Sequence, residues 1–483
     1  MDKNVVLLVM DTARAFDTRY VRETLSDSSL DRLATEGADF VNAFSNSPWT
    51  LPSHTSMFTG AYTSKHGTHA GHKYYEGQFP TLAELLKKEG YETVGITNNA
   101  WVTGEFGLSR GFDRFYKVWQ YIQTDTDFGE IKLTSYGTDR LKEGLTALFS
   151  DDVIANVVNS IYGQFLYRRS DYGAKRTNRL ARKWLSERNG DDPFFLFINY
   201  LEPHLDYQPP REFTEPFLED GSYDEAMNVP QKPWEYVAGK LELSDSDLSL
   251  LQGLYRAEIA YLDEQIGELR ATLEKEGEWE DTVFIVVGDH GENIGDHGLM
   301  DHQYSIHDTL IHVPLFVNGG GFDAVGESEE LVQVVDLFPT ILDIAEASIP
   351  DDSQGRSFHP NSTAKPREHV FAEYISPQPA IERLSEQTGV PSSELEKYSR
   401  EIQAVRTNEH KFVRYSDGIR KLFDLDNNDQ EQEDVLEIQR ATAKELEAEL
   451  DSWLSSFEHA SDGEATEMSR STKQRLEDLG YLQ

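Results

Sequence analysis

A short apolar run near the start of the chain constrains the fold more than any other feature. Val5 to Met10 contains no polar residue and is rich in β-branched side chains, a pattern typical of a strand buried on both faces. Strands of that kind belong to parallel sheets whose two faces are covered by helices. The run ends at Asp11, so the sequence places a carboxylate directly after a core strand.

Strand and helix patterns alternate along the first 345 residues. Further strands are predicted at 39–44, 92–97, 194–200, 282–287 and 313–317, and helices at 29–36, 80–89, 176–188, 244–276 and 331–345. This alternation predicts an α/β fold with a mostly parallel sheet sandwiched by helices. In such sheets ligands bind beyond the carboxyl ends of the strands, so polar residues that follow strands are candidates for a site.

The pattern changes beyond about residue 350. Short alternating runs at 369–374, 402–407, 411–415 and 420–425 predict a small antiparallel sheet, and a helix at 434–457 is expected to pack on it. We therefore divide the chain into a catalytic domain at 1–350, a small α+β subdomain at 351–460, and a linker with a terminal helix at 461–483. Within the first domain, residues 118–175 are expected to form a helical insertion.

The chain is strongly acidic along its whole length. It has 86 acidic and 45 basic residues, which give a formal net charge of -41. Nucleic acids and anionic membrane surfaces both require clustered Lys and Arg, so neither is an expected partner. Self-repulsion of this size destabilises a compact state unless salt screens it. We therefore hypothesise a halophilic protein, as from a haloarchaeon, that works in a salt-rich cytoplasm.

If the acidic surface is an adaptation to salt, the melting temperature rises when KCl is raised from dilute buffer to the molar range. Screening then acts over roughly 3 Å and weakens the repulsion among surface carboxylates. A thermal melt in the two media measures the shift, and an unchanged melting temperature contradicts the hypothesis.

The sequence also excludes several kinds of site and anchor. It contains no cysteine, so disulfides, thiolate metal ligands and cysteine nucleophiles are ruled out. No apolar run reaches the roughly 18 residues that a membrane-spanning helix requires. The first residues lead directly into the first strand without an apolar leader, so we expect a cytoplasmic protein without a membrane span.

The segment from Pro48 to Gly60 is the most informative for chemistry. Pro52 suits the first turn of a helix, which places Thr50 at the helix N-terminus, where free N–H groups favour an anion. A hydroxyl in that position can attack an anionic centre. Threonine is also a common helix cap, and that structural role alone would explain Thr50 in isolation.

Two acidic residues and one histidine favour the catalytic interpretation. Asp11 and the pair Asp289-His290 each end a predicted strand, and the polar run from 289 to 298 is unusual for a buried connection. Two carboxylates and an imidazole suit a divalent cation such as Mg, Mn, Ca or Zn. Such an ion would also bind the Thr50 oxygen and lower its pKa, which makes the hydroxyl a nucleophile.

With these motifs in order, the chain resembles the sulfatase family of the alkaline phosphatase superfamily. The matching motifs are Val-Leu-Leu-Val-Met-Asp-Thr-Ala-Arg at 6–14, Thr-Leu-Pro-Ser-His at 50–54 with Thr-Gly at 59–60, Ser-Lys-His-Gly at 64–67, Arg-Gly-Phe-Asp at 110–113, Glu-Pro-His at 202–204, Gly-Asp-His-Gly-Glu at 288–292 and His-Val-Pro-Leu-Phe-Val at 312–317. The resemblance implies metal-dependent ester hydrolysis and an alkaline-phosphatase-like sheet. The stretch at 422–428 is similar to the small terminal sheet of the family.

The chain departs from the family at several positions. Similar sulfatases carry Cys or Ser where this chain has Thr50, and they oxidise it to a formylglycine aldehyde. A secondary alcohol would give a ketone, so no formylglycine is expected. The Arg of the motif is replaced by His54, the family's Lys is missing near Asn99, and Met10 stands where most members have a second aspartate.

These departures favour phosphoryl substrates. Threonine is the nucleophile of superfamily members that act on phosphoryl groups, so we expect hydrolysis of phosphate mono- or diesters, as by a phosphodiesterase, or of phosphonate esters. The alternatives are a sulfuric ester hydrolase without formylglycine, a soluble phosphoryl-group transferase, or an inactive relative that binds anionic glycans. The expected substrate is a small molecule or a glycan ester.

The resemblance also assigns roles to further residues. His204 and His302 match positions that carry a His and a Lys in sulfatases, where they touch the leaving oxygen or the sulfate, so His204 is the expected general acid. Each could instead be a hydrogen-bonded loop residue. Glu202 and Asp206 could complete a second cation site with His204. Three more residues, His66, Asn99 and Arg14, are candidates for substrate binding, although Arg14 could instead contact Asp17. Structural roles are expected for His69, His72, His297, His307 and His312.

Overall fold

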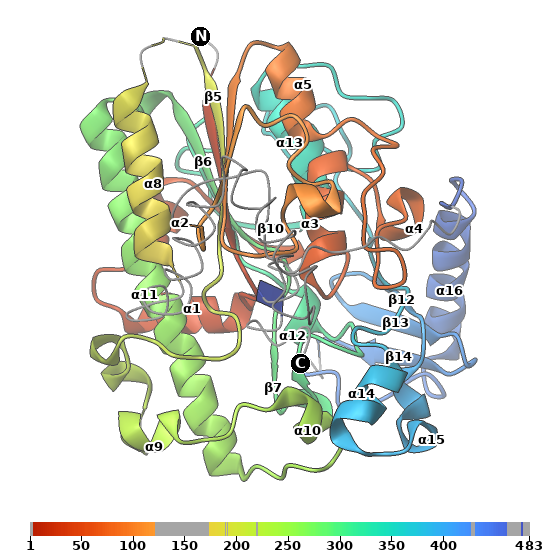
Figure 1. Cartoon of the computed structure of the whole chain (residues 1–483). Helices are drawn as coiled ribbons and strands as arrows, with labels where there is room; N and C mark the ends of the chain where they lie inside the picture. The colour runs from red at the N-terminus through yellow and green to blue at the C-terminus, as the bar shows by residue number, and fades with distance from the viewer. Residues whose placement is uncertain are drawn as a thin grey trace, which may run out of the picture.

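Eight strands form the central sheet, in the order β10-β2-β9-β6-β1-β5-β3-β4, in a computed structural model of the chain (Figure 1). The structure describes residues 3–120, 173–188, 190, 192–218, 221–426, 430–460 and 475–476. Nearly all of the helical insertion expected at 118–175, and most of the linker and terminal helix expected at 461–483, lie outside these residues.

The central sheet is mostly parallel, as expected. Its strands are β1 (Asn4–Met10), β2 (Ala38–Phe44), β3 (Glu92–Thr97), β4 (Arg114–Lys117), β5 (Phe194–Tyr200), β6 (Thr282–Gly288), β9 (Leu315–Asn318) and β10 (Gly326–Gln333). Only β9 runs antiparallel to its neighbours β2 and β6 among these strands. Strand β1 lies between β5 and β6 and pairs with both in parallel.

Helices cover both faces of the sheet because β1 is apolar on both sides. Val5, Leu7 and Val9 pack into one hydrophobic cluster, and the residues between them pack into the other. The first face is covered by α3 (Thr50–Thr59), α5 (Leu82–Lys88) and α13 (Leu337–Ile344), and the second by α2 (Ser29–Glu36), α8 (Ala174–Glu187) and α11 (Asp245–Glu276). Figure 1 shows these two helical layers with the sheet between them. Full burial of each large apolar side chain contributes about 1.5–3 kcal/mol to this sandwich.

A small antiparallel sheet follows at the C-terminal side, also as expected. It consists of β11 (Val370–Tyr374), β12 (Ile402–Arg406), β13 (His410–Tyr415) and β14 (Arg420–Asp424), in that order. Helix α16 (Arg440–Leu454) packs on it through Leu446 and Leu450, which share a cluster with Phe412 and Leu422.

Shorter elements connect these layers. The helices are α1 (Ala15–Thr24), α4 (Thr63–His66), α9 (Tyr223–Met227), α10 (Pro233–Val237), α12 (Asp308–Ile311), α14 (Ile381–Thr388) and α15 (Ser392–Leu395). The strands β7 (Asn293–Ile294) and β8 (Met300–Asp301) form a hairpin after β6. Among the described residues, no helix combines the length and the apolar composition that crossing a membrane requires.

The helix expected at 331–345 begins only at Leu337. Leu331 to Gln333 instead extend β10, which pairs in parallel with β2 and places Leu331 opposite Asn42. The Asp336 carboxylate then accepts a hydrogen bond from the Gln333 N–H and fixes the turn into the helix. Strand pairing is a tertiary contact, and the apolar run was too short to separate a strand from the first turn of a helix.

Candidate active site

Asp11 and Asp289 emerge side by side at the carboxyl end of the central sheet. They follow β1 and β6, and the last residues of these strands, Met10 and Gly288, are directly paired. Both carboxylates are fully buried. The parallel register therefore brings together two acidic side chains that are 278 positions apart, which is the difference between their residue numbers.

Helix α3 brings Thr50 to the same place. Trp49 caps the helix in an extended conformation, so Thr50 is its first residue. The Ser53 hydroxyl donates a 2.7 Å hydrogen bond to the Asp289 carbonyl, which ties the first turn of α3 to the end of β6. The Thr50 Oγ1 atom lies 3.2 Å from His290 Nε2 and accepts a 3.3 Å hydrogen bond from the Asn99 amide.

His290 is held in one tautomer. Its Nδ1 lies 2.9 Å from the Gly291 carbonyl, which can only accept, so Nδ1 carries the proton and Nε2 offers a lone pair toward Thr50. Burial, together with the nearby charge of His302, lowers the pKa of His290 well below its ordinary value. A Cβ on Gly291 would lie 2.1 Å from the Thr309 carbonyl oxygen, so only glycine permits this turn. The ring is therefore neutral, and its Nε2 lone pair is already oriented to bind a metal ion.

Hydrogen bonds fix one oxygen of each carboxylate. Asp11 Oδ2 accepts from the side-chain amides of Asn99 at 2.7 Å and Asn199 at 3.3 Å. Asp289 Oδ1 accepts from the backbone N–H groups of Thr12 at 3.1 Å and His290 at 2.9 Å. Asp11 Oδ1 and Asp289 Oδ2 have no hydrogen-bond partner among the residues that the structure describes. Each carboxylate is thus oriented and keeps one oxygen available for another ligand.

The chemistry of this group fits a divalent cation. Ligand atoms of Asp11, Asp289 and His290 lie within 4.8 Å of one another. Burial raises the pKa of Asp11 to about 6 against the effect of its hydrogen bonds, and burial next to Asp11 raises the pKa of Asp289 well above its ordinary value. Buried carboxylates that lack a compensating charge are costly, and a bound cation supplies that charge.

A second cluster lies beside the first, on the hairpin formed by β7 and β8. Asp301 Oδ1 is 2.6 Å and Glu292 Oε1 is 3.4 Å from His302 Nδ1. Burial disfavours the charged imidazole, but the two carboxylates outweigh burial and hold the pKa of His302 well above its ordinary value. The His302 ring lies 4.6 Å from the ring of His290 and 5.3 Å from that of His204, measured between centroids. The cluster therefore places a charged imidazolium next to the candidate metal ligands.

The three residues expected to form a second cation site, His204, Glu202 and Asp206, do not lie together as a group of ligands. Asp206 is exposed, whereas Glu202 is buried and accepts a hydrogen bond from the Ala174 N–H at 3.2 Å. His204 is buried near the start of the loop after β5, and burial with the neighbouring His302 charge lowers its pKa to about 4. The additional acidic residues near the site are instead Glu292 and Asp301, which the hairpin positions.

The histidines and the arginine near the nucleophile have mainly internal partners. His54 Nδ1 donates a 3.0 Å hydrogen bond to the Thr50 carbonyl, and burial lowers its pKa to about 4, so it does not replace the charge of an arginine. His66 donates from Nε2 to the Ser56 hydroxyl and accepts at Nδ1 from the Thr68 N–H. Arg14 pairs with Asp17 and with Asp296, each at 3.1 Å. Thus His66 and Arg14 support the surroundings of the site, and Asn99 alone of the three expected substrate-binding residues contacts Thr50 and Asp11 directly.

Sequence reasoning missed several charged residues around the site. Glu292 and Asp301 lie in polar runs that we recognised only through their histidines. Lys73 lies 5.3 Å from the Trp101 ring centroid, and burial and the nearby Arg383 charge lower its pKa to about 8. Arg475 donates a 3.2 Å hydrogen bond to the Asn98 carbonyl, although it follows the rest of the site by more than 170 positions. No local pattern distinguishes Lys73 and Arg475 from surface cations.

Paired buried carboxylates at the carboxyl end of a helix-covered, mostly parallel sheet form a site that suits a metal-dependent hydrolase. Residues 3–347 match the sulfatase family, and residues 295–459 match the C-terminal region of N-sulphoglucosamine sulphohydrolase. The chain belongs to the sulfatase family.

Individual relatives support the same assignment. Arylsulfatase K from Bos taurus is 24% identical over 459 residues, which cover 89% of this chain and 77% of that protein. An arylsulfatase from Clostridium perfringens is 26% identical over 411 residues, which cover 78% of this chain and 81% of that protein.

Two solved structures share the fold. The phosphonate monoester hydrolase of Agrobacterium radiobacter has a TM-score of 0.66 at 20% identity and covers 94% of this chain and 95% of its own. A protein in complex with its substrate D-glucosamine-2-N,6-O-disulfate has a TM-score of 0.66 at 18% identity and covers 99% of both chains. At these identities the likeness concerns the fold alone.

The raised pKa of Asp11 predicts a pH-dependent gain in stability for Asp11→Asn without metal. In wild type the folded state holds the Asp11 proton more tightly than the unfolded state, so its contribution to stability falls as pH rises from about 4 to about 6. The metal-free variant therefore melts at a higher temperature than metal-free wild type at pH 8, by the equivalent of on the order of 1–3 kcal/mol. The difference shrinks toward pH 4.

Thermal melts with and without a chelator test this prediction, with Asp323→Asn as the control at an exposed aspartate. Saturating divalent metal is expected to stabilise wild type more than Asp11→Asn. A metal-free variant that is less stable than wild type at pH 8 would show that the carboxylate carries no such penalty.

Proposed function

We propose that this chain is a metal-dependent hydrolase of phosphate mono- or diesters or phosphonate esters that uses Thr50 as its nucleophile. The position of the Thr50 hydroxyl supports this proposal most strongly. It lies at the N-terminus of α3, 3.2 Å from the lone-pair nitrogen of His290, whose ligand atoms cluster with those of Asp11 and Asp289. The proposed cofactor is one divalent cation held by Asp11, Asp289, His290 and Thr50.

The surrounding residues prepare the hydroxyl for attack. When bound, the cation would lower the pKa of the Thr50 hydroxyl and neutralise charge on the transferred group. The Asn99 amide fixes the direction of the Thr50 oxygen by donating to it and to Asp11. The dipole of α3 favours an anionic group in front of Thr50 at its N-terminus. His54 helps by holding the Thr50 carbonyl, which makes it a positioning residue.

The proposed reaction has two displacements. Thr50 Oγ1 releases its proton to solvent and forms a bond to phosphorus while the bond to the ester oxygen breaks, and the leaving oxygen takes a proton from an imidazolium. Water then attacks phosphorus, the bond to Thr50 Oγ1 breaks, and the proton of the attacking water passes to the threonine oxygen. The imidazole recovers its proton from solvent. The products are an alcohol and the free phosphate or phosphonate.

The charge states favour His302 over His204 as the proton donor. His302 is held as an imidazolium by Asp301 and Glu292, whereas His204 has a pKa of about 4 and is neutral. A general acid must carry its proton before the leaving oxygen departs. We therefore assign the acid to His302 and give His204 the role of orienting the leaving group beside it.

The substrate is anionic, although the protein carries a large negative charge. Arg475 and Lys73 supply positive charge near the pocket, at Asn98 and at Trp101 respectively. Threonine at position 50 favours phosphorus, because its secondary alcohol cannot become the aldehyde that sulfatases use. The phosphonate monoester hydrolase fold neighbour is consistent with this preference.

A sulfate ester is the second candidate substrate. The curated relatives are named arylsulfatases, and one fold neighbour was solved with a disulfated glucosamine. In that case Thr50 attacks sulfur directly and no formylglycine takes part. A group transferase or an inactive glycan-binding relative would share the fold, but neither is favoured by a further feature of the site.

Matched nitrophenyl esters of phosphate, phosphodiester, phosphonate and sulfate test the proposal, in high salt with Mg, Mn, Ca or Zn. We expect the highest kcat/KM for a phosphorus ester and loss of turnover on metal removal. Thr50→Ala should lower kcat by at least about 10³-fold because the nucleophile is lost, whereas Thr50→Ser, which keeps a hydroxyl, should retain part of the activity.

Circular dichroism verifies that both variants fold. Near-normal turnover by Thr50→Ala would remove Thr50 from the mechanism. Faster hydrolysis of the sulfate ester by the wild type, lost in Thr50→Ala, would favour the second candidate.

Leaving groups of different acidity distinguish the two histidines. An alkyl ester needs a proton on its leaving oxygen more than a nitrophenyl ester does, so His302→Ala should lose about 10²–10⁴-fold with the alkyl ester and much less with the nitrophenyl ester. His204→Ala should lose similar amounts with both. The opposite pattern in the two variants would show that His204, and not His302, is the general acid.

A further inference from the structure

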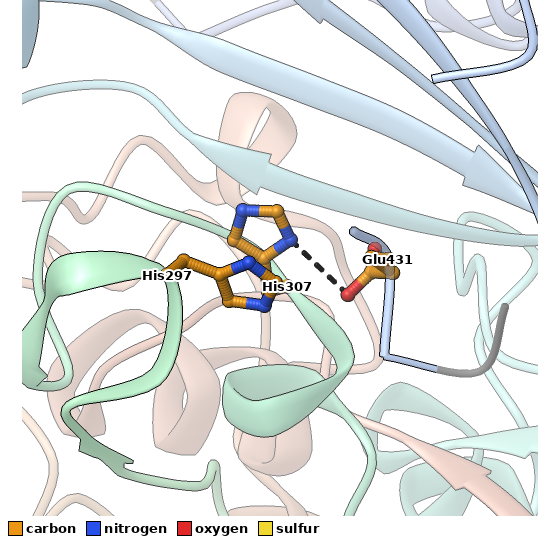
Figure 2. A group of neighbouring side chains, drawn as sticks. All are labelled: His297, His307 and Glu431. Carbon is orange, nitrogen blue, oxygen red and sulfur yellow. Dashed lines mark hydrogen bonds and ion pairs between the residues drawn. The ribbon is translucent and has the colours of Figure 1, made fainter. Parts of the chain in front are cut away.

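A second group of potential metal ligands lies outside the candidate active site. His297 is in the turn between β7 and β8, His307 directly precedes α12, and Glu431 follows β14. Ligand atoms of the three lie within 4.8 Å of one another. Figure 2 shows the two imidazole rings one above the other with the Glu431 carboxylate beside them. The segment after β14 therefore meets two nearby segments of the catalytic domain at this point.

The backbone at this cluster is unusual for its residue types. His297 has φ 54° and ψ 23°, and Glu431 has φ 52°, so both adopt the left-handed conformation without being glycine. Residues with a Cβ in this region cost on the order of 1–3 kcal/mol each and concentrate at functional sites. Two of three candidate ligands are thus held in an unfavourable conformation that brings them together.

We propose that His297, His307 and Glu431 bind a Zn²⁺ ion, separate from the catalytic cation. Two imidazole nitrogens and one carboxylate oxygen match the ligand preference of zinc, which leaves a fourth position for water. Mg²⁺ and Ca²⁺ prefer several oxygen ligands and fit this set poorly. The group borders two clefts of about 800 and 450 Å³, both lined by His297 and Glu431, through which an ion and its water can reach it.

Neighbouring groups hold the Glu431 carboxylate in place. Lys411 Nζ lies 2.8 Å from Glu431 Oε1, and the Asp308 N–H donates at 2.6 Å to Oε2, so Glu431 is ionised and oriented. His307 Nδ1 lies 3.2 Å from the same Oε2 atom.

One ring must turn for both imidazoles to share an ion. Their centroids are 3.6 Å apart and their planes differ by 11°, so the in-plane lone pairs of the two rings run nearly parallel. His297 is exposed and lies in a turn, which leaves its ring space to rotate about χ2 toward the gap beside Glu431. His307 is more enclosed, because it also packs 6.0 Å from the Phe423 ring in β14. We therefore expect His297 to move and His307 to stay.

The ion would connect the segment that follows the small antiparallel sheet to the β7–β8 hairpin beside the candidate active site. Glu431 belongs to the segment after β14, whereas His297 lies four positions before Asp301, which pairs with the proposed acid His302. Binding to the folded chain alone raises its stability by mass action. The proposed zinc therefore has a structural role, and its loss would make the loop that carries His302 less rigid.

Zinc binding to the full chain tests this proposal. The chelated protein is titrated with Zn²⁺ alone by calorimetry, and the bound metal is counted by elemental analysis. We expect two equivalents in wild type. His297→Asn, which tolerates the left-handed backbone but lacks the imidazole, should lose one equivalent or bind it at least tenfold more weakly. The matched control His459→Asn, at an exposed histidine outside the cluster, should bind like wild type.

Further variants separate the two ions. Asp289→Asn should lose the catalytic equivalent and keep the one bound by His297, and His307→Ala should behave like His297→Asn. The rise in melting temperature caused by Zn²⁺ should be smaller in His297→Asn than in the control. Equal zinc stoichiometry and affinity in His297→Asn and wild type would overturn the proposal and leave the cluster as a stacked, hydrogen-bonded contact.

Discussion

The burial of Asp11 and Asp289 next to each other is the constraint on which the site depends. Two carboxylates without access to water repel one another, and burial raises the pKa of both. The structure orients them with hydrogen bonds to one oxygen each and leaves the other oxygen without a partner among the described residues. Such an arrangement is unfavourable for folding alone and favourable for holding a cation. The helix N-terminus of α3 and the fixed tautomer of His290 complete the same pocket.

The partners of each histidine decide what the histidine can do. His290 faces a carbonyl, which favours its neutral form, whereas His302 faces Asp301 and Glu292, which favour its charged form. His66 has both ring nitrogens bonded within the scaffold, so it has no capacity left for a substrate. The same residue type thus serves three functions within a small volume.

The site residues that the sequence predicted lie at local element boundaries, whereas those that it missed are defined by contacts formed in the folded chain. Asp11, Thr50 and Asp289 stand at strand ends and at a helix start, and these boundaries are legible in a single sequence. Glu292 and Asp301 can be recognised as site residues only in the folded structure, where the hairpin pairs Asn293 with Asp301. Arg475 reaches Asn98 from the far end of the chain, which no local pattern can indicate. The site expected at Asp206 does not form, because Asp206 is exposed whereas Glu202 and His204 are buried.

The sequence by itself determined the α/β sandwich, the small antiparallel sheet and the strand-end positions of the proposed catalytic residues. It could do so because apolar periodicity and helix caps are local properties. The tertiary structure decided which charged groups face one another, and therefore which histidine is neutral, which is protonated, and where His297, His307 and Glu431 meet. The protonation state of a buried group depends on its burial and its nearest charges, and both exist only after distant segments have packed.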